Sequence, residues 1–256
     1  MSLPGLTFLG HATMLIELGG LRILTDPILV DRLGFLSRVT RPLSPAHYAA
    51  VDLVLISHLH LDHLDRLSLA RLDPELEIVT GPGGGALARG WGWRRVTELS
   101  PGQSHLVGDV RVIATPAVHP GGRPPFGPRG TAVGFVLESG PARVYFAGDT
   151  DLFAEMAELG AEELDVALLP VGGWGPRLGA GHLSPAAAAE AVVRLQPRYA
   201  VPIHWGTLWP YGMRRVAAGG LEGPPAEFER WLREREGETR ARPLIAPPGE
   251  RVPFVP

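Results

Sequence analysis

The chain has 256 residues, 45% of them apolar, and a formal net charge of −3. This size suits a single domain, residues 1–256, and the weak charge gives no electrostatic reason to expect nucleic acid as a partner. The chain has no cysteine, which excludes disulfides and thiolate metal ligands, so a metal site here would use imidazole and carboxylate groups.

The first strands are expected at residues 6–9, 14–18 and 21–24, with a hairpin turn at Gly19-Gly20. Asp26 ends the third strand. Residues 27–45 are predicted to form a loop, either a flap over a site or plain surface packing. The N-terminus lacks a leader pattern, and no window reaches the roughly 18 apolar residues of a spanning helix. We therefore expect a cytoplasmic protein without stable membrane association.

Four metal-capable side chains follow the apolar run 51–56 within six positions: His58, His60, Asp62 and His63. After a strand, an extended backbone places positions i and i+2 on one face, so one ion can take both His58 and His60. Asp62 and His63 lie where the chain enters an apolar-periodic helix over 64–72, and they can aim at a second point nearby. Clustering by chance is a poor explanation, and two ions are expected.

Further along the chain, strands are expected at 77–80, 96–99 and 110–114. Helices are expected near Ala86, over 152–159, and over 185–195 with Ser184 as its N-cap. The glycine-rich residues 81–85 lack the Lys-Ser/Thr pair of a phosphate loop, which favours a turn before a helix. An apolar stripe over 228–232 is typical of a helix docked on the core, and the tail 242–256 is expected to lie extended over the body.

Three apolar runs each end at a candidate ligand. The run 110–118 leads to His119, 142–147 leads to Asp149, and 199–203 leads to His204. Side chains at strand ends can converge on one rim of a sheet. The sequence thus predicts one site at that rim.

The pattern H-x-H-x-D-H at residues 58–63 resembles the signature of the metallo-β-lactamase superfamily. Several shorter motifs resemble its N-acyl-phosphatidylethanolamine phospholipase D and ascorbate-6-phosphate lactonase branch. They are Gly10-His11-Ala12-Thr13, Asp26-Pro27, Gly148-Asp149-Thr150, Gly181-His182-Leu183-Ser184-Pro185 and His204-Trp205-Gly206-Thr207. The resemblance implies an α/β fold, a four-layer αββα sandwich of two mixed sheets flanked by helices, with ions at one edge.

The resemblance also implies roles for single residues. One ion would take His58, His60 and His119. The other would take Asp62, His63 and His204, with Asp149 bridging both. The candidate catalytic residues are Asp62, Asp149 and His182.

Three further residues each allow more than one interpretation from the sequence. Asp26 fits an acceptor for a ligand imidazole and, equally from local sequence, a turn-forming residue before proline. His11 fits a position beside the metals or a capping or core histidine. His182 fits a substrate contact, donating to an oxyanion or to the leaving group, or a plain loop histidine.

Two glycine-rich loops are expected to border the pocket: residues 121–130 with Phe126, and residues 172–181 with Trp174 and Arg177. The guanidinium group of Arg123, Arg129 or Arg177 could bind a phosphate, or these side chains could simply be solvated. His47 and His105 have no supporting context and are expected to play no part.

The expected function is that of a metal-dependent hydrolase in which a hydroxide bridging two divalent ions cleaves an ester, lactone or phosphodiester bond of a small soluble substrate. Imidazole and carboxylate ligands suit Zn²⁺ first, then Mn²⁺ or Fe²⁺. Two alternatives are a metal-binding protein without turnover and an oxidoreductase of the same fold. The resemblance speaks against the second, because diiron relatives typically carry glutamate where this chain has His60 and rely on a flavin domain. A homo-oligomer is possible.

Overall fold

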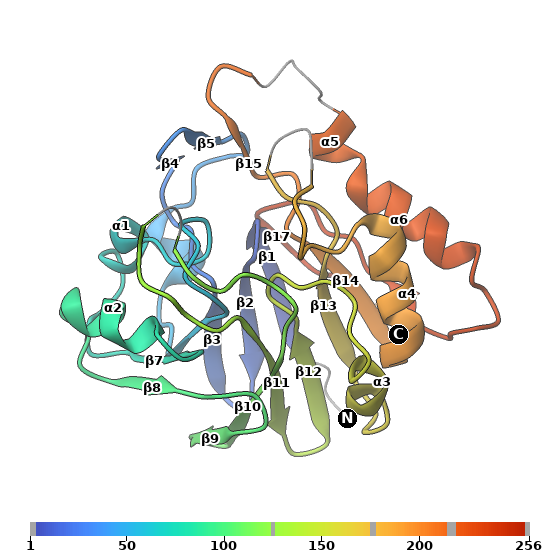
Figure 1. Ribbon diagram of the computed structural model, residues 1–256, viewed down its shortest axis with the longest axis horizontal. Helices are drawn as coiled ribbons and strands as arrows, with labels where there is room; N and C mark the ends of the chain where they lie inside the picture. Colours follow the sequence, from blue (N-terminus) through green and yellow to red (C-terminus); the bar gives the residue numbers. More distant parts are fainter. Residues whose placement is uncertain (1–3, 124–125, 175–177, 214–218, 254–256) are drawn as a thin grey trace.

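The computed structural model describes residues 4–123, 126–174, 178–213 and 219–253, which form two large mixed sheets flanked by a few helices (Figure 1). The first sheet has the order β17-β1-β2-β3-β6-β7-β8, with β1 Gly5–Gly10, β2 Thr13–Leu18, β3 Leu21–Thr25, β6 Leu53–Ile56, β7 Glu77–Thr80, β8 Val96–Glu98 and β17 Glu250–Arg251. The second has the order β16-β14-β13-β12-β11-β10-β9, with β9 Ser104–Val107, β10 Val110–Pro116, β11 Val133–Ser139, β12 Ala142–Phe146, β13 Val166–Pro170, β14 Tyr199–Ile203 and β16 Arg242–Pro243. The predicted mixed α/β fold with two sheets is confirmed.

Strand β6 shows why the first sheet is covered on both faces. Its four residues are all buried, yet they divide between two hydrophobic clusters. Leu53 and Leu55 pack in the core shared with the second sheet, whereas Val54 and Ile56 pack on the opposite face. Because successive side chains of a strand point to opposite faces, a continuous apolar run requires a layer on each side.

Helices cover the outer faces of both sheets (Figure 1). Their bounds are α1 Arg66–Leu69, α2 Gly84–Gly90, α3 Met156–Gly160, α4 Pro185–Leu195, α5 Gly219–Glu222 and α6 Pro224–Arg233, with a 3-10 turn at Pro45–Tyr48. Helix α4 begins as predicted, since the Ser184 hydroxyl accepts a hydrogen bond from the Ala187 N–H. The predicted docking stripe of α6 is also confirmed, because Phe228 and Leu232 are buried in the core. No helix in these described ranges is both long and apolar enough to cross a membrane.

Residues 27–45 were expected as a loop, and the structure corrects this. They contain the short strands β4 (Arg32–Leu33) and β5 (Leu36–Arg38), which form a hairpin joined to β15 (Leu208–Pro210) in a separate three-stranded sheet. Two- and three-residue strands carry no period of their own. Their pairing depends on a partner far away in the chain.

Two predicted helices are shorter than expected. Helix α1 covers only four residues of the predicted 64–72. It begins after Asp65, whose carboxylate accepts a hydrogen bond from the Ser68 N–H. After Leu69 the backbone makes single i→i+3 turns instead of continuing the helix. Helix α3 begins at Met156, so the first half of 152–159 is not helical. Strands β9, β11 and β13 were not predicted, although the apolar runs of β11 and β13 carry the usual signal.

The ends of several strands meet at one edge of the paired sheets. Strands β3 and β6 of the first sheet end at Thr25 and Ile56, and they are followed directly by Asp26 and by the segment Ser57-His58. Strands β10, β12 and β14 of the second sheet lead in the same way to His119, Asp149 and His204. The fold thereby gathers side chains that are far apart in sequence.

Candidate metal centre

Three imidazoles form a first group of possible ligands, here called the first triad: His58, His60 and His119. One nitrogen from each lies within 4.8 Å of the others, and His119 Nε2 is 3.1 Å from His60 Nδ1. The His119 Nδ1–H donates to the Gly181 carbonyl at 2.7 Å, so its Nε2 presents a lone pair.

The tautomer of His58 follows from its neighbours. The Ser57 hydroxyl donates to Asp26 Oδ2 at 2.6 Å, so it is free only to accept from His58 Nδ1–H, which lies 2.9 Å away. The lone pair of His58 is thereby directed from Nε2, a buried atom with no hydrogen-bond partner in the described ranges. A buried, unpaired acceptor is costly unless a cation or donor meets it.

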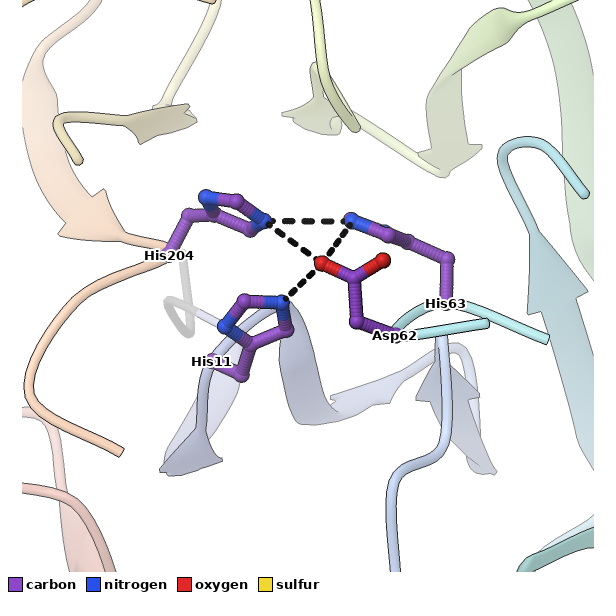
Figure 2. Close-up of side chains that lie close together, drawn as sticks. All are labelled: His11, Asp62, His63 and His204. Carbon is purple, nitrogen blue, oxygen red and sulfur yellow. Dashed lines mark hydrogen bonds and ion pairs between the residues drawn. The ribbon is translucent and has the colours of Figure 1, made fainter. Parts of the chain in front are cut away.

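The second triad consists of Asp62, His63 and His204, and His11 lies against it (Figure 2). The Nε2 atoms of His63 and His204 are 3.1 Å apart, and Asp62 Oδ2 is 3.6 Å and 3.8 Å from them. The His204 Nδ1–H donates to the Gly172 carbonyl at 2.8 Å, which turns its Nε2 inward. The donors of this triad therefore also face a common point.

Asp149 lies between the two triads. Its Oδ2 is 3.1 Å from His63 Nε2 and 4.0 Å from His58 Nε2, and its Oδ1 is 3.3 Å from His204 Nε2. The residue is buried, and neither oxygen has a hydrogen-bond partner of good geometry among the described residues. A carboxylate in this place can contact both triads.

The charges of the second triad favour a cation. Burial raises the pKa of Asp149, but the nearby His204 and His63 lower it well below the usual value, and Asp62 behaves in the same way. Burial lowers the pKa of His63, but Asp149, Asp62 and Asp26 raise it well above the usual value. The positive charge of the His63 imidazolium thus offsets the negative charge of these carboxylates when no metal ion is bound. The donor set fits divalent ions that accept nitrogen and oxygen ligands.

Asp26 forms hydrogen bonds that orient a histidine in each of the two triads. Its carboxylate is fully buried, and it accepts hydrogen bonds from the Ser57 N–H at 2.7 Å, the Ser57 hydroxyl at 2.6 Å and the His63 Nδ1–H at 2.7 Å. It therefore orients His63 directly and His58 through Ser57. The structure places Asp26 as an acceptor for an imidazole. Ser57 was missed in the sequence because a single serine carries no local signal.

His11 occupies the turn between β1 and β2 with a left-handed backbone, φ 56°. Its N–H donates to the Thr207 hydroxyl at 2.8 Å, and its carbonyl accepts from the His204 N–H at 2.7 Å. Its Nε2 lies 2.9 Å from Asp62 Oδ2, and a dashed line marks this contact in Figure 2. His11 thus holds the end of β14 and orients a carboxylate of the second triad.

His182 lies at the open side of the centre. Its Nε2 is 3.2 Å from Asp149 Oδ2, its Nδ1–H donates to the Gly179 carbonyl at 3.1 Å, and 19% of its side chain is exposed. His182 also forms a group with His119 and Asp149 in which one possible ligand atom from each residue lies within 4.8 Å of the others. Contact with a substrate and contact with an ion are both compatible with this position.

A pocket of about 580 Å³ opens above the donors. Its described lining residues are Leu33, Gly34, Phe35, Leu36, His60, Leu61, Asp62, Gly173, Trp174, Leu178, Gly179, His182 and His204. Of the loop 172–181, the residues Gly173, Trp174, Leu178 and Gly179 border it as predicted, whereas no described residue of 121–130 does. Phe126 is 98% exposed outside this lining, so its expected place at the pocket was wrong.

The remaining sequence candidates lie elsewhere. His47 contacts Ser44 at the 3-10 turn, and His105 Nε2 lies 2.7 Å from Glu77 Oε1. Arg123 donates to the Leu64 carbonyl and lies over the Trp91 ring, which ties down its loop. Arg129 is exposed, and Arg177 lies outside the described residues.

Residues 21–205 match the family model described as "Beta-lactamase superfamily domain". The chain belongs to the beta-lactamase superfamily. An uncharacterized protein of Mycobacterium tuberculosis is 35% identical to it, over 96% of this chain and 68% of the relative. A protein of Aeropyrum pernix named UPF0173 metal-dependent hydrolase is 32% identical, over 97% of each chain. Among solved structures, the metallo hydrolase Igni18 of Ignicoccus hospitalis is similar with a TM-score of 0.76, 26% identity and 99% coverage of both chains.

Proposed function

We propose that this superfamily member is a metal-dependent hydrolase that binds two divalent ions and cleaves an ester, lactone or phosphodiester bond of a small molecule. The observation that carries the proposal is the position of Asp149 between two triads whose ligand atoms face inward, beneath an open pocket. The names of the relatives in Aeropyrum pernix and Ignicoccus hospitalis support hydrolysis. The narrower branch suggested by the motifs stays a prediction.

The first triad would hold one ion and the second triad the other, with Asp149 contacting both. When bound, such ions would supply Lewis acidity that polarises the scissile group and lowers the pKa of a water molecule. Zn²⁺ suits these ligands first, and Mn²⁺ or Fe²⁺ are the other candidates. Asp26 and His11 would keep the ligand side chains in place when the charge between them changes.

His182 would act on the substrate side of the centre. It is partly exposed in the pocket wall, and the Gly179 and Ala180 carbonyls orient its ring, with Nε2 directed toward the centre. From there it can donate a hydrogen bond to the oxygen that gains charge, or a proton to the leaving group.

The test is hydrolysis of chromogenic esters, simple lactones and phosphodiesters by the metal-loaded protein and its Asp149→Asn variant. We expect turnover to fall at least about a hundredfold, because the amide cannot supply the negative charge between two cations. Asp151→Asn is the matched control, since within the described part of the chain the Asp151 carboxylate accepts only the neighbouring Leu152 N–H and is not among the pocket's lining residues. Near-normal turnover by Asp149→Asn would refute the proposal.

A further inference from the structure

One wall of the pocket is built from large apolar side chains. They come from the β4–β5 hairpin, the segment 58–63 and the loop 172–181, and they are Leu33, Phe35, Leu36, Leu61, Trp174 and Leu178. Phe35 is 61% exposed and Trp174 38% exposed, and their rings meet edge to face with centroids 5.1 Å apart. Aromatic side chains exposed together beside polar donors mark a binding surface more often than plain surface.

Hydrogen bonds hold the hairpin side of this wall in place. The Phe35 carbonyl accepts a hydrogen bond from the Tyr211 N–H at 2.9 Å, which ties the tip of the hairpin to the segment after β15. Within β5, the Arg38 guanidinium donates to the Leu9 carbonyl at 3.2 Å and to the Ile28 carbonyl at 2.5 Å. A surface held in this way loses little entropy when a ligand covers it.

The apolar wall begins directly at the donors. Leu61 stands between His60 and Asp62 in the chain and is 49% exposed. At Gly173 a methyl group would contact Leu178 at 3.4 Å and the His204 ring at 3.7 Å. Because Gly173 carries no side chain, the floor of the pocket runs unobstructed from a ligand imidazole to the wall.

The described lining residues include no arginine, and the two arginines of the hairpin strands, Arg32 and Arg38, contact other groups. Arg32 lies over the Tyr211 ring, 3.9 Å from its centroid, and Arg38 is buried against backbone carbonyls. Recognition of a phosphate or carboxylate group usually employs a charge-assisted hydrogen bond from such a side chain. The described wall offers contact for an uncharged, apolar group instead.

From these observations we propose that the pocket selects uncharged carboxylic esters or lactones whose acyl chain is apolar, with the chain lying along Phe35, Leu61 and Trp174. The inference rests on the proposed hydrolase function and narrows it. In the reaction, the oxygen of water bonds to the acyl carbon and the bond from that carbon to the alcohol oxygen breaks. One proton of water goes to the departing alcohol, and the other is released when the acid ionises.

The test measures kcat/KM of the metal-loaded protein for p-nitrophenyl acetate, butyrate, hexanoate and octanoate. Each added methylene is expected to raise kcat/KM about fourfold until the wall is covered. Two further probes are the mono-p-nitrophenyl ester of glutaric acid, which carries a charge at the chain end, and bis-p-nitrophenyl phosphate. Both are expected to be poorer than the neutral hexanoate by at least about tenfold.

The variants Phe35→Ala and Trp174→Ala should flatten the dependence of kcat/KM on chain length, so that the ratio of the octanoate value to the acetate value falls at least about tenfold. Phe126→Ala is the matched control, because Phe126 is an exposed aromatic residue outside the pocket lining. It should keep the full dependence. A flat series for the unaltered protein, a preference for the charged ester, or equal flattening by Phe126→Ala would each overturn the inference.

Binding of butyrate and octanoate, as product analogues, separates this inference from the proposed function. Both are titrated calorimetrically into the metal-loaded protein. If no substrate is turned over, the proposed hydrolase function fails. Tighter binding of octanoate that is lost in Phe35→Ala would still support the apolar site, whereas equal binding of the two acids would overturn it.

Discussion

His182 and His204 both line the pocket and contact Asp149, but the His182 side chain is 19% exposed whereas that of His204 is 1% exposed. We expect His182→Ala to lower kcat by about 10²–10³ because a donor to the reacting oxygen or leaving group is lost. Elemental analysis should find the metal content of the variant unchanged. A loss of one ion per chain would instead identify His182 as a ligand.

Proton release on metal binding should differ between the two triads. Burial lowers the pKa of His119 to about 4 and also lowers those of His58 and His60, so the first triad is already neutral at pH 7. The pKa of His63 is raised well above its usual value, so an ion entering the second triad must displace a proton.

The directions of these pKa shifts determine how metal affinity depends on pH at each triad. Affinity at the first triad should stay nearly constant between pH 8 and 6, whereas affinity at the second should fall as the pH is lowered. Calorimetric titrations with Zn²⁺ in two buffers of different ionisation enthalpy measure the protons released at each step. Equal proton release at both steps would contradict this description of His63.

Gly148 shows how an element sets the site, because it turns the chain between β12 and Asp149 with φ 60°. A methyl group there would lie 2.5 Å from Ser57 Cβ, which supports both Asp26 and His58. We expect Gly148→Ala to lower the free energy of unfolding by about 2–3 kcal/mol and to weaken metal binding. Both are measured by denaturant titration and by competition with a chelator.

Gly140→Ala is the control for that variant. Gly140 has φ 55° in the turn between β11 and β12, and nothing lies within 4 Å of an added methyl group. It should therefore show only the backbone cost of about 1 kcal/mol, with normal metal binding. Equal effects of the two substitutions would mean that the contact with Ser57 is unimportant.

The sequence predicts long buried strands and the segment 58–63 because their signals are local. β7 and β14 match their predicted bounds, as does α4 with its Ser184 cap. The β4–β5 hairpin could not be predicted, since its strands are stabilised by β15 far along the chain. The same applies to the pocket wall, where Phe35 meets Trp174 only after folding.

The supporting residues of the centre show the same limit. Asp26 before Pro27 fits a turn as well as an acceptor, and only the contact with His63 distinguishes the two. His11 carries no local signal, and its contact with Asp62 joins two loops of the first sheet. The motif resemblance predicted that both positions lie beside the metals, and the structure shows which atoms they contact.

Metal removal should affect stability without unfolding the core. The two triads lie at the strand ends, whereas the main cluster between the sheets contains none of their side chains. At an ion concentration a thousandfold above each Kd, each bound ion contributes about 4 kcal/mol, so removal of both by a chelator should lower the Tm by roughly 20 °C. Circular dichroism at 25 °C should be nearly unchanged. Loss of most secondary structure on chelation would show that the ions fold the protein.

The most direct test of the two-ion centre is an anomalous difference map from crystals grown with Zn²⁺. The account predicts two peaks on either side of Asp149, one among His58, His60 and His119 and the other among Asp62, His63 and His204. An empty centre, or a single peak coordinated by other residues, would contradict it.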